Sequence, residues 1–257
     1  MKKTVAMALL ATSFISAAFA EVIKVGATPI PHAEILEFIK PELKKEGYEL
    51  EIKVFNDYVV PNLAVEDGDL DANYFQHIPY LNEFNANKGT HLVKTAGVHL
   101  EPMGIYSKKI KSLKDLKDGA TISIPNDPTN ESRALDVLVN AKLIEVDNSA
   151  KLRTPLDITK NSKNLKFKEL EAATLPRTLD DVDIAVINTN FAMNANLNPT
   201  KDALALESKD SPYVNIVVVK KGNQNSKKIK ALDAALNTKA VKDFIADKYK
   251  GAIIPAF

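Results

Sequence analysis

The side chains that could do chemistry are gathered in short polar clusters that follow predicted strands. The first two clusters occupy 56–58 and 73–80, and the second is rich in aromatic residues. Aromatic residues at such spacing usually belong to a core. However, Gln76 and His77 lie among them, and open α/β sheets bind ligands at the carboxyl ends of their strands. We therefore interpret the two clusters as parts of a pocket wall.

A third cluster, at 125–133, combines two prolines with Asn, Asp and Thr residues. This composition is typical of a capped helix start, whose free backbone N–H groups suit a carboxylate. Arg133 falls in the first helical turns and is one of only three arginines in the chain. Its planar guanidinium could hold a ligand carboxylate through two parallel hydrogen bonds. A surface ion pair is the alternative, and the sequence leaves both open.

Two asparagines mark the remaining clusters, at 187–191 and 211–215. Asn188 ends an apolar strand and Asn215 interrupts another. A buried amide is costly unless it is hydrogen-bonded, and a bound zwitterion could supply that partner. The apolar run at 214–219 gives Asn215 no evident structural role. We therefore expect its removal to leave the ligand-free protein at least as stable.

Signatures of catalysis are missing from the sequence. It contains no G-x-S-x-G elbow, phosphate-binding glycine loop, G-x-G-x-x-G turn or H-E-x-x-H helix. The absence of cysteine excludes disulfides and thiolate chemistry. The histidines match no metal-binding spacing; they are His32, His77, His91 and His99. We accordingly predict no catalytic residues, no metal and no cofactor.

Apolar runs of strand type alternate with helical patterns along the chain, which predicts an α/β fold with mostly parallel sheets. The predicted strands are 22–27, 50–55, 70–75, 120–124, 165–170, 183–187 and 214–220. The predicted helices are 34–45, 62–66, 79–86, 130–143, 226–236 and 239–250. The β-rich stretch at 92–106 and the return of the chain at 214–220 favour two crossings between two halves.

Two lobes joined by two crossing strands form a Venus-flytrap binding protein of type II-like architecture, with the ligand in the cleft. The predicted domains are a signal peptide at 1–20, a discontinuous lobe 1 at 21–108 plus 205–257, and lobe 2 at 109–204.

The amino terminus predicts secretion to the periplasm. Lys2 and Lys3 precede an apolar segment at 5–17, and small residues at 18 and 20 fit cleavage after Ala20. Because no cysteine follows, we expect a freely diffusing protein with no lipid anchor. The balance of 34 basic and 33 acidic residues argues against a nucleic-acid partner.

Seven ordered motifs carry a family resemblance. They are FNDYVVPN (55–62), GDLDANYFQHIPYL (68–81), MGIYSKKIKSLKDLKDG (103–119), IPNDPTNESRAL (124–135), NLKFKELEAATLPRTLDD (164–181), AVINTNFA (185–192) and SPYVN (211–215). With these motifs the chain resembles the NlpA family of methionine-binding proteins, the MetQ-type components of methionine ABC importers. Members commonly carry a lipid-modified Cys after the signal peptide, where this chain has Ala20 and Glu21.

The resemblance implies a ligand-binding role and no enzymatic activity. It implies a thioether pocket formed by Tyr58, Phe75, His77 and Tyr80. It also implies a polar clamp formed by Arg133, Asn188 and Asn215. The implied partners are methionine and the permease of an ABC importer, and we expect a monomer.

Other functions remain open at this point. The ligand could be a methionine derivative, a methionine-containing dipeptide or another apolar amino acid, because one methylene group is worth only about 1–3 kcal/mol in such a pocket. A periplasmic enzyme that modifies amino acids and a surface interaction protein are the alternatives from other classes.

Overall fold

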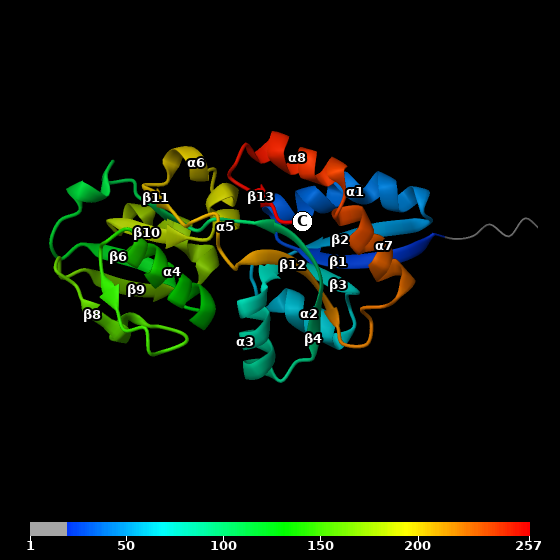
Figure 1. The fold of residues 1–257 in the computed structure, drawn as a ribbon, viewed down its shortest axis with the longest axis horizontal. Helices are drawn as coiled ribbons and strands as arrows, with labels where there is room; N and C mark the ends of the chain where they lie inside the picture. Colours follow the sequence, from blue (N-terminus) through cyan, green and yellow to red (C-terminus); the bar gives the residue numbers. More distant parts are fainter. Residues whose placement is uncertain (1–19) are drawn as a thin grey trace, which may run out of the picture.

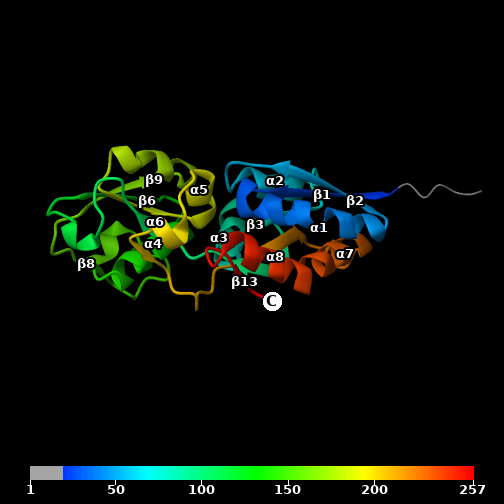
Figure 2. The same ribbon diagram turned by 90° about the horizontal axis from the view of Figure 1, so that it is seen from above.

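The computed structural model describes residues 20–257, and these residues form two α/β lobes that lie side by side (Figure 1). Figure 2 shows the same separation from above, with the amino- and carboxyl-terminal elements together in one lobe. The predicted signal peptide lies outside the described residues except for Ala20. The predicted two-lobed α/β class is confirmed.

Lobe 1 is built on a six-stranded sheet. Its strand order is β13 (Ile254–Pro255), β4 (Leu92–Leu100), β12 (Val214–Lys220), β3 (Ala72–His77), β1 (Glu21–Ala27) and β2 (Tyr48–Val54). Strand β1 is parallel to both β2 and β3, whereas β12 is antiparallel to β3 and β4. The sheet is therefore mixed, because the chain enters it again from the other lobe, and the prediction of mostly parallel sheets fails here.

Helices cover both faces of this sheet (Figure 1). One face carries α1 (Glu34–Lys45), α7 (Lys227–Leu236) and α8 (Lys239–Tyr249), and the other carries α2 (Val60–Asp67) and α3 (Ile78–Lys88). A π-helical turn at Pro29–Ala33 leads into α1.

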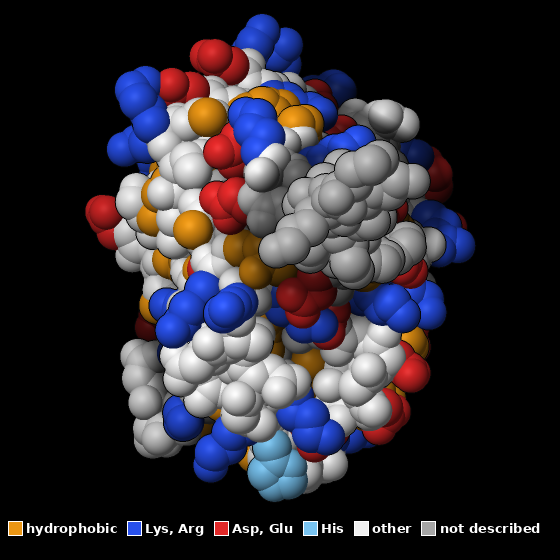
Figure 3. All heavy atoms as spheres, turned by 90° about the vertical axis from the view of Figure 1, so that its right-hand side faces the viewer, with side chains coloured by type: hydrophobic (Ala, Val, Ile, Leu, Met, Phe, Trp, Pro, Cys, Tyr) orange, Lys and Arg blue, Asp and Glu red, His pale blue; other side chains and the backbone are white. Residues whose placement is uncertain are grey.

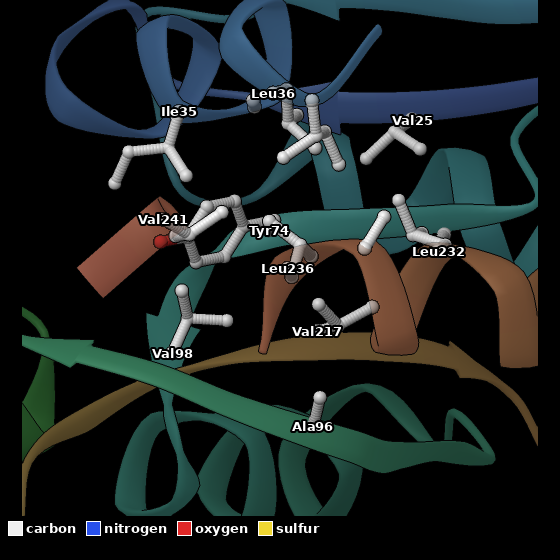
Figure 4. Close-up of a cluster of buried hydrophobic side chains, with 14 of the residues drawn as sticks. Val25, Ile35, Leu36, Tyr74, Ala96, Val98, Val217, Leu232, Leu236 and Val241 are labelled. Atoms are coloured by element: carbon white, nitrogen blue, oxygen red, sulfur yellow. The ribbon is translucent and has the colours of Figure 1, made fainter. Parts of the chain in front are cut away.

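Strand β12 is apolar from Ile216 to Val219 because this stretch is buried on both faces. Val217 packs with Val25, Leu36 and Leu232 in the core beneath α1 and α7, as Figure 4 shows. Its neighbour Val218 points the other way and packs with Leu81 of α3. Successive side chains of a strand alternate between faces, so this one strand joins the two cores of lobe 1.

Lobe 2 has a five-stranded sheet and a separate hairpin. The sheet order is β11 (Ala205–Leu206), β5 (Gly104–Tyr106), β10 (Ile184–Ile187), β6 (Thr121–Pro125) and β9 (Lys166–Leu170). The hairpin pairs β7 (Glu145–Val146) with β8 (Ile158–Lys160). Its α-helices are α4 (Pro128–Asn140), α5 (Thr189–Asn194) and α6 (Pro199–Asp202). Short 3-10 helices occupy Leu113–Asp115, Pro155–Asp157 and Ala172–Asp180.

Two segments cross between the lobes. The first, at 101–103, joins β4 to β5, and the second, at 207–213, joins β11 to β12. Strands β5 and β11 thus belong to the sheet of lobe 2, although their residues lie outside the predicted range 109–204. The domain limits 21–108 plus 205–257 and 109–204 stay a prediction.

The charged side chains of the surface are mixed in sign. In the view of Figure 3, Lys and Arg side chains are interspersed with Asp and Glu, so this face presents no broad basic patch of the kind that binds nucleic acid. In the part of the chain that the structure describes, no helix is long and apolar enough to span a membrane.

Candidate ligand-binding site

A narrow pocket lies between the lobes, with a cavity volume of about 20 Å³ within about 330 Å³ of empty space that includes open solvent. Its lining residues are Tyr58, Phe75, Gln76, His77, Tyr80, Glu101, Asn130, Arg133, Asn188, Thr189, Asn190 and Asn215. All seven predicted site residues are among them. The lining residues come from both lobes and, with Glu101, from the first crossing segment. A cleft that closes between two lobes holds its ligand at such a place.

Aromatic rings form one wall of the pocket. The Tyr58 ring stacks on Phe75 at 5.6 Å between centroids and meets the edge of Tyr80 at 5.8 Å. Phe191 of α5 approaches the Tyr58 ring to 4.9 Å from the other lobe. Burial raises the pKa of the Tyr58 phenol well above its usual value, so the ring stays neutral. Such an apolar wall of ring faces and edges suits a polarizable thioether.

His77 presents a neutral imidazole to the pocket. Its Nδ1 accepts a hydrogen bond from the Tyr80 backbone N–H (3.2 Å), which caps helix α3. The proton therefore lies on Nε2, which donates to the Asn130 side-chain oxygen at 3.2 Å. Burial, with Arg133 nearby, lowers the pKa of His77 to about 3. Its ring is uncharged at neutral pH.

Arg133 also lines the pocket, and both it and His77 pack on the Tyr213 ring. Its Nε donates to both carboxylate oxygens of Glu207 at 3.0 and 3.2 Å, and NH2 donates to Glu207 at 2.5 Å. A further hydrogen bond joins NH2 to the Glu101 carbonyl at 2.7 Å. The side chains of Arg133 and Glu207 are only 3% and 10% exposed. Arg133 thus lines the pocket and also forms an ion pair, but the pair is buried, so the surface alternative is wrong.

The two predicted asparagines differ in their partners. Asn188 donates to Asn130 at 2.9 Å, while its own Oδ1 is buried and has no partner among the described residues. Asn215 Oδ1 lies 3.0 Å from His32 Nε2. Asn188 therefore has a free acceptor in the pocket, whereas Asn215 already has one hydrogen bond inside lobe 1.

Glu101 is the main residue that the sequence analysis missed. In the first crossing segment, its side chain lies 3.2 Å from His32 Nε2 and 2.8 Å from His99 Nε2. It also accepts the backbone N–H of Asn190 from lobe 2 at 2.9 Å. Burial lowers the pKa of His32 to about 4 and that of His99 to about 3. The imidazoles are therefore neutral. His99 Nε2 donates to the Glu101 side chain, whereas His32 Nε2 donates to Asn215 Oδ1.

A sequence signal for part of this network existed. His99 and Glu101 are two residues apart at the end of a strand, a spacing that places side chains on the same face. One imidazole nitrogen each of His32 and His99 and one carboxylate oxygen of Glu101 lie within 4.8 Å of one another, which is close enough for them to share a metal ion. A hydrogen bond from His99 to Glu101 and one from His32 to Asn215 account for this arrangement. The other lining residues lie within the predicted clusters but were not among the seven predicted site residues; they are Gln76, Asn130, Thr189 and Asn190.

Glu131 carries a testable pH dependence. It is buried near the start of α4, and its Oε1 has no partner among the described residues. Burial raises the pKa of Glu131 to about 7, with Glu169 and Asp127 contributing. The folded state then holds a proton on Glu131 that the unfolded state releases near its ordinary pKa of 4.5. Stability from this group is consequently lost as pH rises from about 4.5 to 7.

We expect Glu131→Gln to raise the free energy of unfolding at pH 8 by about 1 kcal/mol, discounted for solvent screening. At pH 4 the effect should be close to zero, because the carboxyl is then largely protonated in both the folded and the unfolded state. Urea denaturation at the two pH values measures the difference. The matched change at exposed Glu46 should have no effect at either pH, and an equal shift at both pH values for Glu131→Gln would contradict the pKa assignment.

Two α/β lobes, two crossing segments and a polar and aromatic pocket shared between the lobes define a two-lobed substrate-binding protein. The NlpA lipoprotein family matches residues 23–257. The chain belongs to this family, as the sequence motifs predicted.

Named relatives and solved structures agree with this assignment. The methionine-binding lipoprotein MetQ of Bacillus subtilis is 48% identical over 91% of this chain and 87% of its own length. The D-methionine-binding lipoprotein MetQ of Escherichia coli is 42% identical over 90% of this chain and 87% of its own. A nutrient-binding protein from Burkholderia cenocepacia, solved bound to methionine, superposes with a TM-score of 0.89 at 46% identity, covering 91% of this chain and all of that one.

One prediction is contradicted by these comparisons, namely the freely diffusing periplasmic protein without a lipid anchor. The family is described as lipoproteins, and the Bacillus and Escherichia relatives are named as lipoproteins, a class that is held at the membrane through an acylated amino-terminal cysteine. The prediction was based on the lack of cysteine in the sequence and of a Gly/Ser-rich tether after Ala20.

Proposed function

We propose that this protein binds methionine and delivers it to the permease of an ABC importer. The observation that carries the proposal is the pocket between the lobes, which has a cationic end at Arg133 and an aromatic wall around Tyr58. Relatives named for methionine binding, and a similar structure bound to methionine, support the same ligand.

The polar end of the pocket matches an amino-acid zwitterion. Arg133 offers positive charge to the ligand's carboxylate, because charge-assisted hydrogen bonds are the stronger ones. The free Oδ1 of Asn188 is an acceptor for the ammonium group, and the Asn215 side chain lines the same end. Glu101 is the carboxylate among the lining residues of the pocket. Its presence favours a ligand that also carries a positive charge.

The apolar end matches the thioether. Tyr58, Phe75 and Tyr80 surround it with rings, and neutral His77 adds a polarizable edge without a charge. Sulfur–aromatic contacts contribute about 0.3–1.5 kcal/mol each. The seven residues proposed to hold the ligand are Tyr58, Phe75, His77, Tyr80, Arg133, Asn188 and Asn215.

The proposed role is binding without turnover, by a monomer. Both ring nitrogens of His77 are engaged, Nε2 as a donor to the Asn130 amide and Nδ1 as an acceptor of the Tyr80 N–H, so this imidazole activates no nucleophile. Membership of a family of substrate-binding proteins supports this role. Incubation with methionine and analysis of the products would expose an enzyme by the appearance of a new compound.

The test is a thermal-shift and calorimetry panel of L-methionine, D-methionine, norleucine and glutamine. Methionine should raise Tm with concentration, since a ligand at 100 times its Kd stabilises by about 2.7 kcal/mol. Norleucine has the same shape without sulfur and should bind more weakly. If no methionine enantiomer binds while a derivative, a dipeptide or another apolar amino acid does, the proposed ligand is wrong. Native mass spectrometry of the purified protein reports any ligand that is carried along.

A further inference from the structure

Arg133 has few free donors for a ligand. A guanidinium carries five N–H groups. Those of Nε and NH2 are taken by the Glu207 carboxylate and the Glu101 carbonyl. Within residues 20–257, no hydrogen bond engages NH1. The Nε and NH2 groups, which could bind a ligand carboxylate through two parallel hydrogen bonds, are therefore already engaged. The N–H groups of NH1 remain as the donors that a ligand in the pocket could use.

Glu207 is itself fixed by both crossing segments. Its backbone N–H donates to the Met103 carbonyl at 2.8 Å, and its Oε2 accepts the Met103 N–H at 3.1 Å. Ser211 donates to its Oε1 at 3.2 Å from the second crossing. Glu207 consequently links α4, through Arg133, to the two segments that join the lobes.

The plane of the guanidinium is also restrained. The Tyr213 ring centroid lies 4.2 Å from the Arg133 carbon Cζ, a cation–π distance. Glu207 on one edge and Tyr213 on one face together leave the guanidinium little freedom to rotate. An arginine side chain otherwise loses considerable rotamer entropy when it is immobilised.

We propose that Glu207 is a positioning residue for the ligand's carboxylate, acting through Arg133 and not by contact with the ligand. This inference rests on the proposed function. Two effects of Glu207 oppose each other. Its negative charge weakens the pull of Arg133 on a second carboxylate, whereas its hydrogen bonds hold NH1 towards the pocket. Because the pair is buried and doubly hydrogen-bonded, orientation outweighs charge here.

The experiment measures two ligands by calorimetry with Glu207→Gln. L-methionine carries the carboxylate, and methioninol replaces it with an alcohol. The glutamine side chain of this variant would have nearly the same shape as that of Glu207. Its amide carries no charge and has one acceptor oxygen in place of two, so the ion pair with Arg133 is lost. We expect the affinity for L-methionine to fall by about 5- to 20-fold and that for methioninol by less than about twofold. In a double variant with Arg133→Lys, the Glu207 effect should disappear.

The matched control is Asp136→Asn. Asp136 also lies on α4 and pairs with an arginine, Arg153, at 2.6 Å, but neither residue lines the pocket. Both ligands should bind this variant as they bind the wild type.

Unchanged or tighter methionine binding by Glu207→Gln would overturn the inference, and so would an equal loss for the two ligands. If the variant does not fold, Glu207→Asp withdraws the carboxylate by one methylene group, and the same selective loss is expected. Failure of the wild type to bind methionine would instead refute the proposed function.

Discussion

Arg133→Ala should weaken methionine binding by about 2–5 kcal/mol, the largest effect of any single substitution in the site. The physical reason is that the ligand's carboxylate then enters a buried pocket without its cation. The same change leaves the Glu207 carboxylate, 10% exposed in the wild type, without its partner. We therefore also expect the free energy of unfolding of the ligand-free protein to fall by about 3–5 kcal/mol.

Calorimetry and urea denaturation of the same preparation measure both quantities. Arg133→Lys should recover only part of either, because an ammonium cannot hold the two Glu207 oxygens and the Glu101 carbonyl at once. Arg153→Ala is the control, since Arg153 pairs with Asp136 outside the pocket. Wild-type affinity in Arg133→Ala would place the ligand's carboxylate elsewhere in the cleft.

Asn215→Ala should reduce the affinity for methionine by about 1.5–3 kcal/mol, the range for a hydrogen bond to a charged group. It should also lower the stability of the ligand-free protein by about 1 kcal/mol, because Asn215 Oδ1 accepts a hydrogen bond from buried His32 at 3.0 Å. The sequence analysis expected no such loss. His32 Nε2 also lies 3.2 Å from the Glu101 carboxylate, which limits the cost.

The paired measurement is affinity and melting temperature for the one variant. Asn87→Ala removes an exposed asparagine side chain and should change neither. If stability falls and affinity is retained, Asn215 is a structural amide of lobe 1, and the polar clamp consists of Arg133 and Asn188.

The elements that the sequence predicted best are those with strong periodicity and local boundaries. The helix at 34–45 and the strand at 214–220 were predicted with the bounds that the structure shows. The short strands β11 and β13, of two residues each, were missed. Two residues carry no readable period, and these strands exist only because a sheet edge formed elsewhere in the chain accepts them.

The site was predicted as a set of residues but not as a network. Residues that face a ligand lie in local motifs, such as the 73–80 cluster, and so could be found. The partners that hold them are remote in sequence: His32 is 183 residues from Asn215, and Glu207 is 74 residues from Arg133. Among many acidic residues, nothing local distinguishes Glu207, because it is selected by tertiary contact.

The position of β12 has a consequence for how the chain folds during synthesis. This strand lies between β3 and β4 in the sheet of lobe 1, yet it is made after all of lobe 2. A nascent chain that ends before Val214 therefore has two strands that cannot pair with each other, and a gap where the apolar strand belongs. Lobe 2 is formed by one continuous segment of the chain and can fold before lobe 1 is complete. Such late, long-range strand insertion is intrinsically slow and leaves apolar surface exposed meanwhile, so the nascent protein is most vulnerable to aggregation in the interval before its last 44 residues emerge.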